Sequence, residues 1–403
     1  MKNLDVRQLK LKTQAVHAGE TPDEKTGASS PNIVMSSTYI ASPEVGFSAE
    51  NEEQSNEYVY SRWKNPTLEQ LENKLAILEN AEASVVFGSG MAAITSLFVT
   101  FLRPGDQLIM SDITYAGASE YANEILPNMG IEIDRVNLSD LPSLSAAIKP
   151  NCKMIYVESP CNPICRLTDI AAVTQVAKAH GAKVAVDSTF ASPIATQPIN
   201  LGADFVIHSL TKFMGGHGDA LGGAVIGSQD DMDELRRVML VHGGGVMSPF
   251  NAWLIMRGIA TLPLRMRAHQ EAATAVSQYL ENHPKVEQVV YPGLSSHPQH
   301  DLAKQQMRNF SGMLTFRVKD GPRATRLFAE YLEIFHYAVS LGHHRSLLFY
   351  MPTDDLLSTT FKLTERQAAS YRAYAGDGMF RTSIGIEDPD DLCADLEFAL
   401  SKL

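Results

Sequence analysis

Short apolar runs alternate with amphipathic stretches over residues 84–226. Strands are predicted at 84–87, 107–110, 131–136, 153–157, 183–186, 204–207 and 223–226. Helices are predicted between them at 91–101, 118–126 and 169–180. Nearly continuous apolar strands separated by amphipathic helices are typical of a mostly parallel sheet with helices on both faces. The pattern therefore predicts an α/β fold.

The pattern changes on both sides of this region. A long helical stretch at 264–280 precedes strands near 286–290, 313–318 and 380–383, which predicts a second, smaller α+β domain. Residues before about 60 show little sustained periodicity, and ordered structure is expected from a capping-box pattern at Thr67 to Gln70. We therefore expect an extended arm over 1–62, an α/β domain over 63–260 and a C-terminal domain over 261–403.

Charge and composition exclude several partners. The 403 residues carry a formal net charge of -12, which argues against nucleic acid or an anionic membrane as the main partner. No apolar run of about 18 residues is present, and the polar first residues lack the apolar core of a signal peptide. Four cysteines are too few for a disulfide framework, so a cytoplasmic protein is expected. Cys161 and Cys165 lack a second ligand pair, and no metal site is predicted.

A lysine follows the predicted strand at 204–207. The strand leads into Ser209, Thr211 and Lys212, and a run of glycines comes next. Desolvation lowers the pKa of a lysine and leaves an amine that forms an imine with an aldehyde. The two hydroxyls are suitable phosphate ligands. Together these residues indicate a Schiff-base lysine for pyridoxal 5'-phosphate (PLP), although most such strings are strand ends with a solvated lysine.

Other candidate residues also follow predicted strands, where ligands bind in parallel α/β sheets. Asp187 ends an apolar strand, and its carboxylate would suit a protonated pyridine nitrogen. The alternatives are a helix cap or an acid paired with a surface arginine. Ser89, Gly90 and Met91 open a predicted helix whose backbone amides could hold a phosphate. Their string matches neither a Walker loop nor the GxGxxG dinucleotide motif.

Three further residues are candidates for the same cofactor and substrate site. Tyr115 could stack on a flat cofactor, and the amide of Asn162 could hydrogen-bond to a phenolate oxygen. Arg381, on a strand of the second domain, could grip a substrate carboxylate with two hydrogen bonds. A half-buried tyrosine and a surface arginine are the commoner interpretations of single residues. The ordered occurrence of all these groups favours one cofactor site.

Motifs along nearly the whole chain resemble those of the Cys/Met-metabolism (trans-sulfuration) family of PLP-dependent enzymes. They are Val16-His-Ala-Gly19, Tyr60-Ser-Arg62, Asn65-Pro-Thr67, Ser89-Gly-Met91, Ser209-Leu-Thr-Lys212, Gly216-His-Gly-Asp219, Ser248-Pro-Phe-Asn251, Tyr291-Pro-Gly293 and Ile384-Gly-Ile-Glu-Asp-Pro389. The resemblance implies the PLP-dependent transferase fold of the aspartate-aminotransferase type (fold type I). This fold has a mostly parallel seven-stranded sheet and a smaller α+β C-terminal domain.

The resemblance also implies roles for individual residues. The catalytic residues would be Lys212, which forms the imine and shuttles protons, Tyr115 and Asp187. The cofactor-binding residues would be Tyr60, Arg62, Ser89, Gly90, Met91, Tyr115, Asn162, Asp187, Ser209, Thr211 and Lys212. Ser340 and Arg381 would bind the substrate carboxylate. Tyr60 and Arg62 would reach the phosphate of a neighbouring subunit, so a homotetramer (dimer of dimers) with shared active sites is expected.

The sequence constrains the reaction less than it constrains the family. The strings Met247-Ser-Pro-Phe-Asn-Ala-Trp253 and Gly293-Leu-Ser-Ser-His-Pro-Gln299 look most like methionine γ-lyase, which implies α,γ-elimination on methionine or homocysteine. Val339 stands where cystathionine-handling members often carry a glutamate. The alternatives are γ-replacement by an O-acetyl- or O-succinylhomoserine sulfhydrylase or a cystathionine γ-synthase, cystathionine γ-lyase activity, and a non-catalytic PLP-binding or regulatory protein.

Several positions depart from the methionine γ-lyase pattern. Gly117 replaces a cysteine beside the substrate, and Ser188 replaces an asparagine after the aspartate. Leu240-Val241 replaces a Lys-Asp pair, and Trp63-Lys64 replaces a pair that ends in glycine. The stretch His343 to Pro352 also departs from the family pattern and closely follows Ser340, so it could reshape specificity or reflect drift in a loop.

Overall fold

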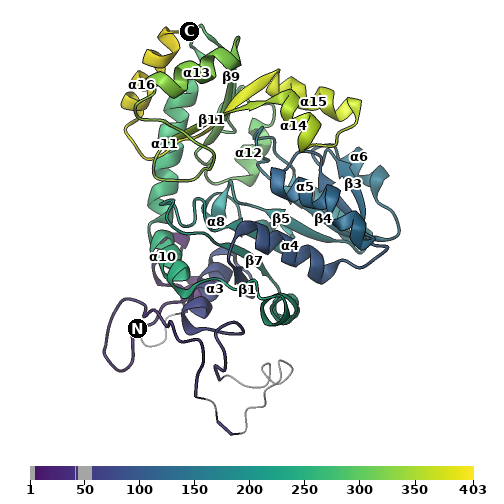
Figure 1. Cartoon of the computed structure of the whole chain (residues 1–403), viewed down its shortest axis with the longest axis vertical. Helices are drawn as coiled ribbons and strands as arrows, with labels where there is room; N and C mark the ends of the chain where they lie inside the picture. Colours follow the sequence, from purple (N-terminus) through teal and green to yellow (C-terminus); the bar gives the residue numbers. More distant parts are fainter. Residues whose placement is uncertain (1–4, 41, 44–56) are drawn as a thin grey trace. The chain divides into compact units, whose positions relative to one another are not determined.

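The computed structural model describes residues 5–40, 42, 43 and 57–403. The chain, coloured along its sequence in Figure 1, divides into two compact units, of which the first comprises Met1–Phe101 and Asp204–Thr261. The second comprises Leu102–Ala203 and Leu262–Leu403. The predicted fold class is confirmed, because the chain is α/β with a mostly parallel large sheet and a second, smaller sheet. The predicted boundaries at residues 62 and 260 stay predictions.

The first unit contributes three neighbouring strands of the large sheet, β1 (Ala83–Phe87), β7 (Gly223–Gly227) and β6 (Phe205–Ser209). Both pairings of β7 are antiparallel, and they place Phe87 and Ser209 opposite Gly223. Among its described residues, the helical elements of this unit are η1 (Val6–Gln8), α1 (Leu11–His17), α3 (Pro66–Glu79), α4 (Gly90–Phe101), α9 (Gln229–Leu235), the π-helix η4 (Arg236–His242) and α10 (Pro249–Ala260).

Helix α4 packs on β6 and β7, and α3 packs on β1. The apolar face of α4 is buried through Ile94, Leu97 and Phe98, because these residues recur at helical spacing. Burial of this face fixes the start of α4 beside the end of β6.

The second unit contributes four parallel strands to the large sheet, in the order β5 (Lys183–Asp187), β4 (Cys152–Glu158), β2 (Gln107–Ser111) and β3 (Glu132–Val136). The helices between and after these strands are α5 (Ala116–Glu124), η2 (Leu126–Met129), α6 (Leu141–Ala147), α7 (Ile170–Ala179), α8 (Ser192–Ala195) and η3 (Pro198–Leu201). Since the strands are parallel, their carboxyl ends meet at one edge, where Glu158 and Asp187 lie.

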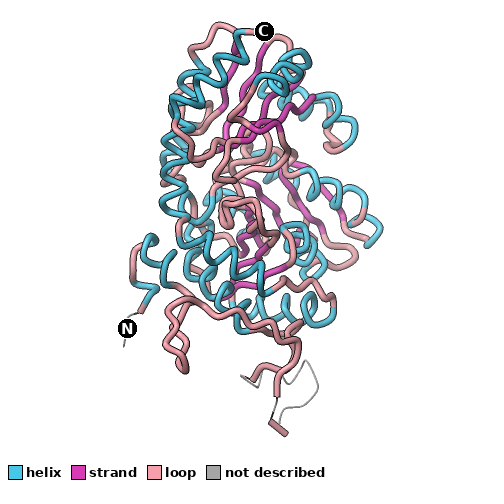
Figure 2. The backbone as a smooth tube through the Cα atoms, turned by 60° about the vertical axis from the view of Figure 1, so that its left-hand side comes forward, coloured by secondary structure: helices cyan, strands magenta, loops and turns pink. Residues whose placement is uncertain are grey.

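A five-stranded sheet completes the second unit (Figure 2). Its order is β10 (His336–Tyr337), β11 (Leu347–Pro352), β12 (Gly378–Ser383), β9 (Met313–Val318) and β8 (Val286–Val290). The helices of this part are α11 (Leu262–Glu281), α12 (His300–Gln306), α13 (Gly321–Tyr331), α14 (Thr353–Thr359), α15 (Glu365–Ala375) and α16 (Pro389–Ser401). The rings of Phe316, Phe328 and Phe380 pack together in the core, with centroids 4.8 to 6.2 Å apart.

Local details differ from the sequence predictions. Helix α3 begins at Pro66 rather than Thr67, because the side chain of Asn65 accepts hydrogen bonds from the backbone N–H groups of Thr67 and Leu68. The predicted arm contains helix α1, whose Gln14 and Ala15 are buried. The part of the arm at 1–4, 41 and 44–56 lies outside the described residues. No helix among the described residues is long and apolar enough to cross a bilayer.

Candidate active site

Lys212 lies in a tight turn directly after β6 in the first unit. Its backbone N–H donates to Ser209 O (3.1 Å), and its carbonyl accepts from the N–H of Gly216 (2.8 Å). The hydroxyl of Thr211 accepts from the N–H of Gly222 (3.1 Å) and donates to the carbonyl of Gly222 (3.3 Å). Lys212 is half-buried, while Phe213, the next residue, is fully buried. The turn therefore holds the lysine backbone firmly at the end of the strand.

The first turn of α4 lies against the end of β6. A Cβ atom added at Gly90 would lie 2.9 Å from the Cβ of Ser209 and 3.0 Å from its Oγ, closer than van der Waals contact allows. Ser89 caps the helix, since its Oγ accepts from the N–H of Ala92 (3.1 Å). The structure thus brings Ser89, Gly90 and Met91 beside Ser209. A helix N-terminus next to a hydroxyl is a suitable cradle for a phosphate.

Two residues of the predicted arm also lie in the first unit. The guanidinium of Arg62 lies 5.3 Å from the centre of the Tyr60 ring, and its Nη1 donates to the carbonyl of Val241. The Tyr60 side chain is 40% exposed. Their role toward a neighbouring subunit stays a prediction.

Asp187 ends β5 in the second unit and is 5% exposed. Its Oδ2 accepts a hydrogen bond from the hydroxyl of Tyr156 (3.1 Å), and its Oδ1 accepts from the N–H of Thr189 (3.0 Å). Tyr156 is fully buried, and burial, followed by the charge of Asp187, raises its pKa well above the ordinary value. A buried carboxylate held by neutral donors suits a cationic ring nitrogen.

Glu158 is a site residue to which the sequence analysis gave no role. It ends β4 directly opposite Asp187. Its carboxylate accepts from the backbone N–H groups of Tyr115 (2.6 Å) and Asn162 (2.7 Å) and from the hydroxyl of Thr114. Burial, and then the charge of Asp187, raise the pKa of Glu158 to about 8. The sequence carries the same signal for Glu158 as for Asp187, namely an acidic residue at the end of an apolar strand.

Tyr115 occupies the N-cap position of α5, and its side chain is 42% exposed. Partial burial, followed by the charge of Asp187, raises its pKa above the ordinary value. Its phenol is therefore protonated at neutral pH. The hydrogen bond from its backbone N–H to Glu158 fixes the residue at the start of α5, and its side chain offers an aromatic face and a proton donor.

Arg381 lies on β12 and connects two other predicted residues. Its Nη1 donates to Asn162 Oδ1 and its Nη2 to the carbonyl of Ser340, both at 3.1 Å. Burial lowers the pKa of Arg381, but a guanidinium remains a cation at neutral pH. The structure thus brings Asn162, Ser340 and Arg381 together, and the role of Ser340 and Arg381 toward a substrate carboxylate stays a prediction.

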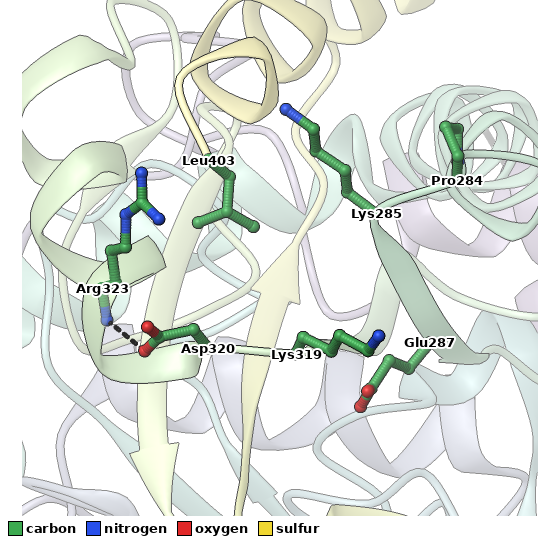
Figure 3. Close-up of a pocket in the computed structure, with 7 residues that line it drawn as sticks. All are labelled: Pro284, Lys285, Glu287, Lys319, Asp320, Arg323 and Leu403. Carbon is green, nitrogen blue, oxygen red and sulfur yellow. Dashed lines mark hydrogen bonds between the residues drawn. The ribbon is translucent and has the colours of Figure 1, made fainter.

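A separate hollow of about 310 Å³ lies elsewhere in the second unit (Figure 3). Its lining residues are Pro284, Lys285, Glu287, Lys319, Asp320, Arg323 and Leu403. The Nζ of Lys285 donates to the carbonyls of Leu400 (2.8 Å) and Ser401 (3.2 Å), so this cation caps the C-terminal end of α16. The hollow contains none of the predicted site residues. Among the described residues, no cluster of His, Cys, Asp and Glu could hold a metal ion.

Comparison with known proteins assigns the family. A family model described as Cys/Met metabolism PLP-dependent enzyme matches residues 12–401. The chain belongs to this family. It is 40% identical to the canavanine gamma-lyase of Pseudomonas canavaninivorans, over 100% of this chain and 98% of that protein. It is also 40% identical to the L-methionine gamma-lyase of Pseudomonas putida, over 96% of each protein.

Solved structures of the family show the same fold. The crystal structure of metB from Corynebacterium glutamicum has a TM-score of 0.89 and 37% identity, and the match covers 99% of this chain and 100% of that one. Membership confirms PLP as the cofactor and confirms a carbon–sulfur lyase or synthase of the trans-sulfuration family. The close approach at Gly90 and the buried carboxylate of Asp187 fit this cofactor. The roles of individual residues stay predictions.

Proposed function

We propose that this family member catalyses α,γ-elimination on a methionine- or homocysteine-type amino acid. The main support is the network around Arg381, whose two donors fix it between Asn162 and Ser340. A guanidinium fixed in this way suits an amino acid α-carboxylate. The 40% identity to an L-methionine gamma-lyase favours a γ-linked sulfur as the leaving group.

PLP, when bound, supplies an electron sink for carbanion chemistry. In our proposal the residues of the chain hold the cofactor and substrate in place and transfer protons. The Nζ of Lys212 removes the proton from the substrate Cα and moves protons between substrate carbons. The Asp187 carboxylate holds the proton of the pyridine nitrogen, and the α4 amides with Ser209 and Thr211 hold the phosphate. The phenol of Tyr115, protonated at neutral pH, can donate a proton to the leaving sulfur.

Canavanine is the second candidate substrate. The canavanine gamma-lyase aligns with 100% of this chain at the same 40% identity as the methionine enzyme. Canavanine carries oxygen rather than sulfur on its γ-carbon, so the same active-site residues would act on a different leaving group. Gly117, at the position where methionine γ-lyases carry a cysteine beside the substrate, is compatible with a changed pocket.

A substrate panel on the purified holoenzyme tests the proposal. Elimination on methionine is expected to release 2-oxobutyrate and methanethiol in equal amounts. Turnover of canavanine without turnover of methionine or homocysteine would select the second candidate. Thioether formation from O-acetylhomoserine and a thiol, with no elimination product, would contradict both candidates and indicate γ-replacement.

We also propose a cytoplasmic homotetramer, a dimer of dimers with shared active sites. The support is the position of Tyr60 and Arg62 on the arm, where the Arg62 guanidinium lies 5.3 Å from the centre of the Tyr60 ring and Tyr60 is 40% exposed. The four cysteines are free, and three of them are buried, as is common in a reducing compartment. Light scattering on the purified protein is expected to give four times the mass of one chain.

A further inference from the structure

His343 lies three residues after Ser340, in the stretch that departs from the family pattern. Its Nε2 lies 3.2 Å from the Oγ of Ser340. The carbonyl of Ser340 accepts from the Nη2 of Arg381 (3.1 Å). Ser340 therefore connects the imidazole to the predicted carboxylate-binding arginine through two different groups, its hydroxyl and its carbonyl.

The Ser340 backbone is held in an unusual conformation. Its φ of +125° is a value that side-chain-bearing residues rarely adopt, so the surrounding structure must hold the backbone in place. The loop that holds it is fixed to the end of β12, since the N–H of Gly342 donates to Ser383 Oγ (2.7 Å). In addition, the N–H of Ile386 donates to the carbonyl of His344 (2.9 Å). These bonds fix the loop backbone that carries Ser340 and His343.

The direction of the hydrogen bond decides what the Ser340 hydroxyl can do. A hydroxyl has one hydrogen and two lone pairs. If the imidazole Nε2–H donates to Oγ, it occupies a lone pair and the hydroxyl hydrogen can be directed at an anion. If Oγ donates to the imidazole, the same hydrogen is turned away from a carboxylate on Arg381.

We propose that His343 is a positioning residue for the substrate α-carboxylate, in that its Nε2–H donates to Ser340 Oγ and directs the hydroxyl hydrogen at that carboxylate. This inference rests on the proposed function, because it assumes an amino acid bound at Arg381. The carboxylate then receives hydrogen bonds from the guanidinium and from Ser340. His343 itself touches neither the substrate nor the cofactor.

The test compares the binding of two unreactive ligands to the holoenzyme by calorimetry. L-Norleucine has the α-carboxylate and no γ leaving group, and L-norleucinamide has a neutral amide in its place. The wild type is expected to prefer norleucine. In His343→Phe this preference is expected to fall about three- to tenfold, which corresponds to the loss of one hydrogen bond. His343→Gln, whose amide N–H can donate at similar reach, is expected to regain part of it.

His336→Phe is the matched control, because His336 is an exposed histidine on β10 of the same sheet. It is expected to keep the wild-type preference. Thermal melting of each variant reports folding separately from ligand discrimination. An unchanged preference in His343→Phe, with norleucine bound by the wild type, would overturn the inference and leave the proposed function intact. A wild type that does not distinguish the two ligands would instead overturn the carboxylate site at Arg381.

Discussion

Glu158 and Asp187 stand directly opposite each other at the ends of β4 and β5, and both are buried. Asp187 accepts from Tyr156 and Thr189, whereas Glu158 accepts from the backbones of Tyr115 and Asn162. The Asp187 carboxylate is the one predicted to pair with the nitrogen of the cofactor ring. The other fixes the two loops that carry residues predicted to contact that ring.

Stability of the apoenzyme should fall as pH rises through the titration of Glu158. Burial and Asp187 raise the pKa of Glu158 from 4.5 to about 8, so the folded chain keeps a proton that the unfolded chain releases above about pH 4.5. The unfolded state then binds fewer protons, and the free energy of unfolding decreases between about pH 4.5 and 8. Urea unfolding at several pH values measures this decrease.

Glu158→Gln is the matched variant for that measurement. The glutamine does not titrate, so the decrease should be smaller in this window. It offers one acceptor oxygen for three donors, so it should also destabilise the chain by roughly 1–3 kcal/mol for a donor left unsatisfied. A pH dependence identical to that of the wild type would show that Glu158 titrates outside this range.

Asp187→Asn should weaken catalysis far more than it weakens folding. The amide cannot hold a positive ring nitrogen, and a hydrogen bond to a charged group is worth roughly 1.5–3 kcal/mol, or about ten- to a hundredfold in rate. Steady-state kinetics on the best substrate, at saturating PLP, measure the effect. Tyr156→Phe is the control, because it removes one donor to Asp187 and keeps the charge. Equal losses in the two variants would contradict a charge-based role for Asp187.

Gly90→Ala should lower the affinity for PLP. The new Cβ would lie 2.9 Å from the Cβ of Ser209, so the start of α4 or the end of β6 must move. Fluorescence titration of the apoenzyme with PLP is expected to show a dissociation constant raised by about five- to a hundredfold, because packing strain of this kind costs about 1–3 kcal/mol. Gly88→Ala is the neighbouring control, since its Cβ would meet only the carbonyl of Val246, at 3.5 Å. Equal PLP affinities in the two variants would indicate that the phosphate binds elsewhere.

Shared active sites predict complementation between two inactive variants. Arg62→Ala removes the arm contribution, and Lys212→Ala removes the lysine. Mixed and reassembled tetramers should contain some sites with both native residues and regain a fraction of wild-type activity. Each variant alone, taken through the same reassembly, is the control. Mixtures that stay as inactive as the single variants would show that Arg62 acts within its own chain.

Much of the large sheet could be predicted from the sequence, because its buried strands are continuous apolar runs that end in chemically distinctive residues. Strand β11 was not predicted, because its residues fall in the stretch from His343 to Pro352 that was interpreted as a loop. The role of Glu158 was not predicted either, because it depends on the partners of its carboxylate rather than on a motif. The register that places Glu158 opposite Asp187 is likewise a property of the folded sheet.

Chemical reduction tests most directly whether Lys212 forms the imine with PLP. The holoenzyme is treated with borohydride, digested and analysed by mass spectrometry, in parallel with Lys212→Ala. A cofactor adduct is expected on the peptide that carries Lys212 in the wild type, and no borohydride-fixed adduct is expected in the variant. A wild-type adduct on another lysine, or an adduct that survives in Lys212→Ala, would contradict this role of Lys212.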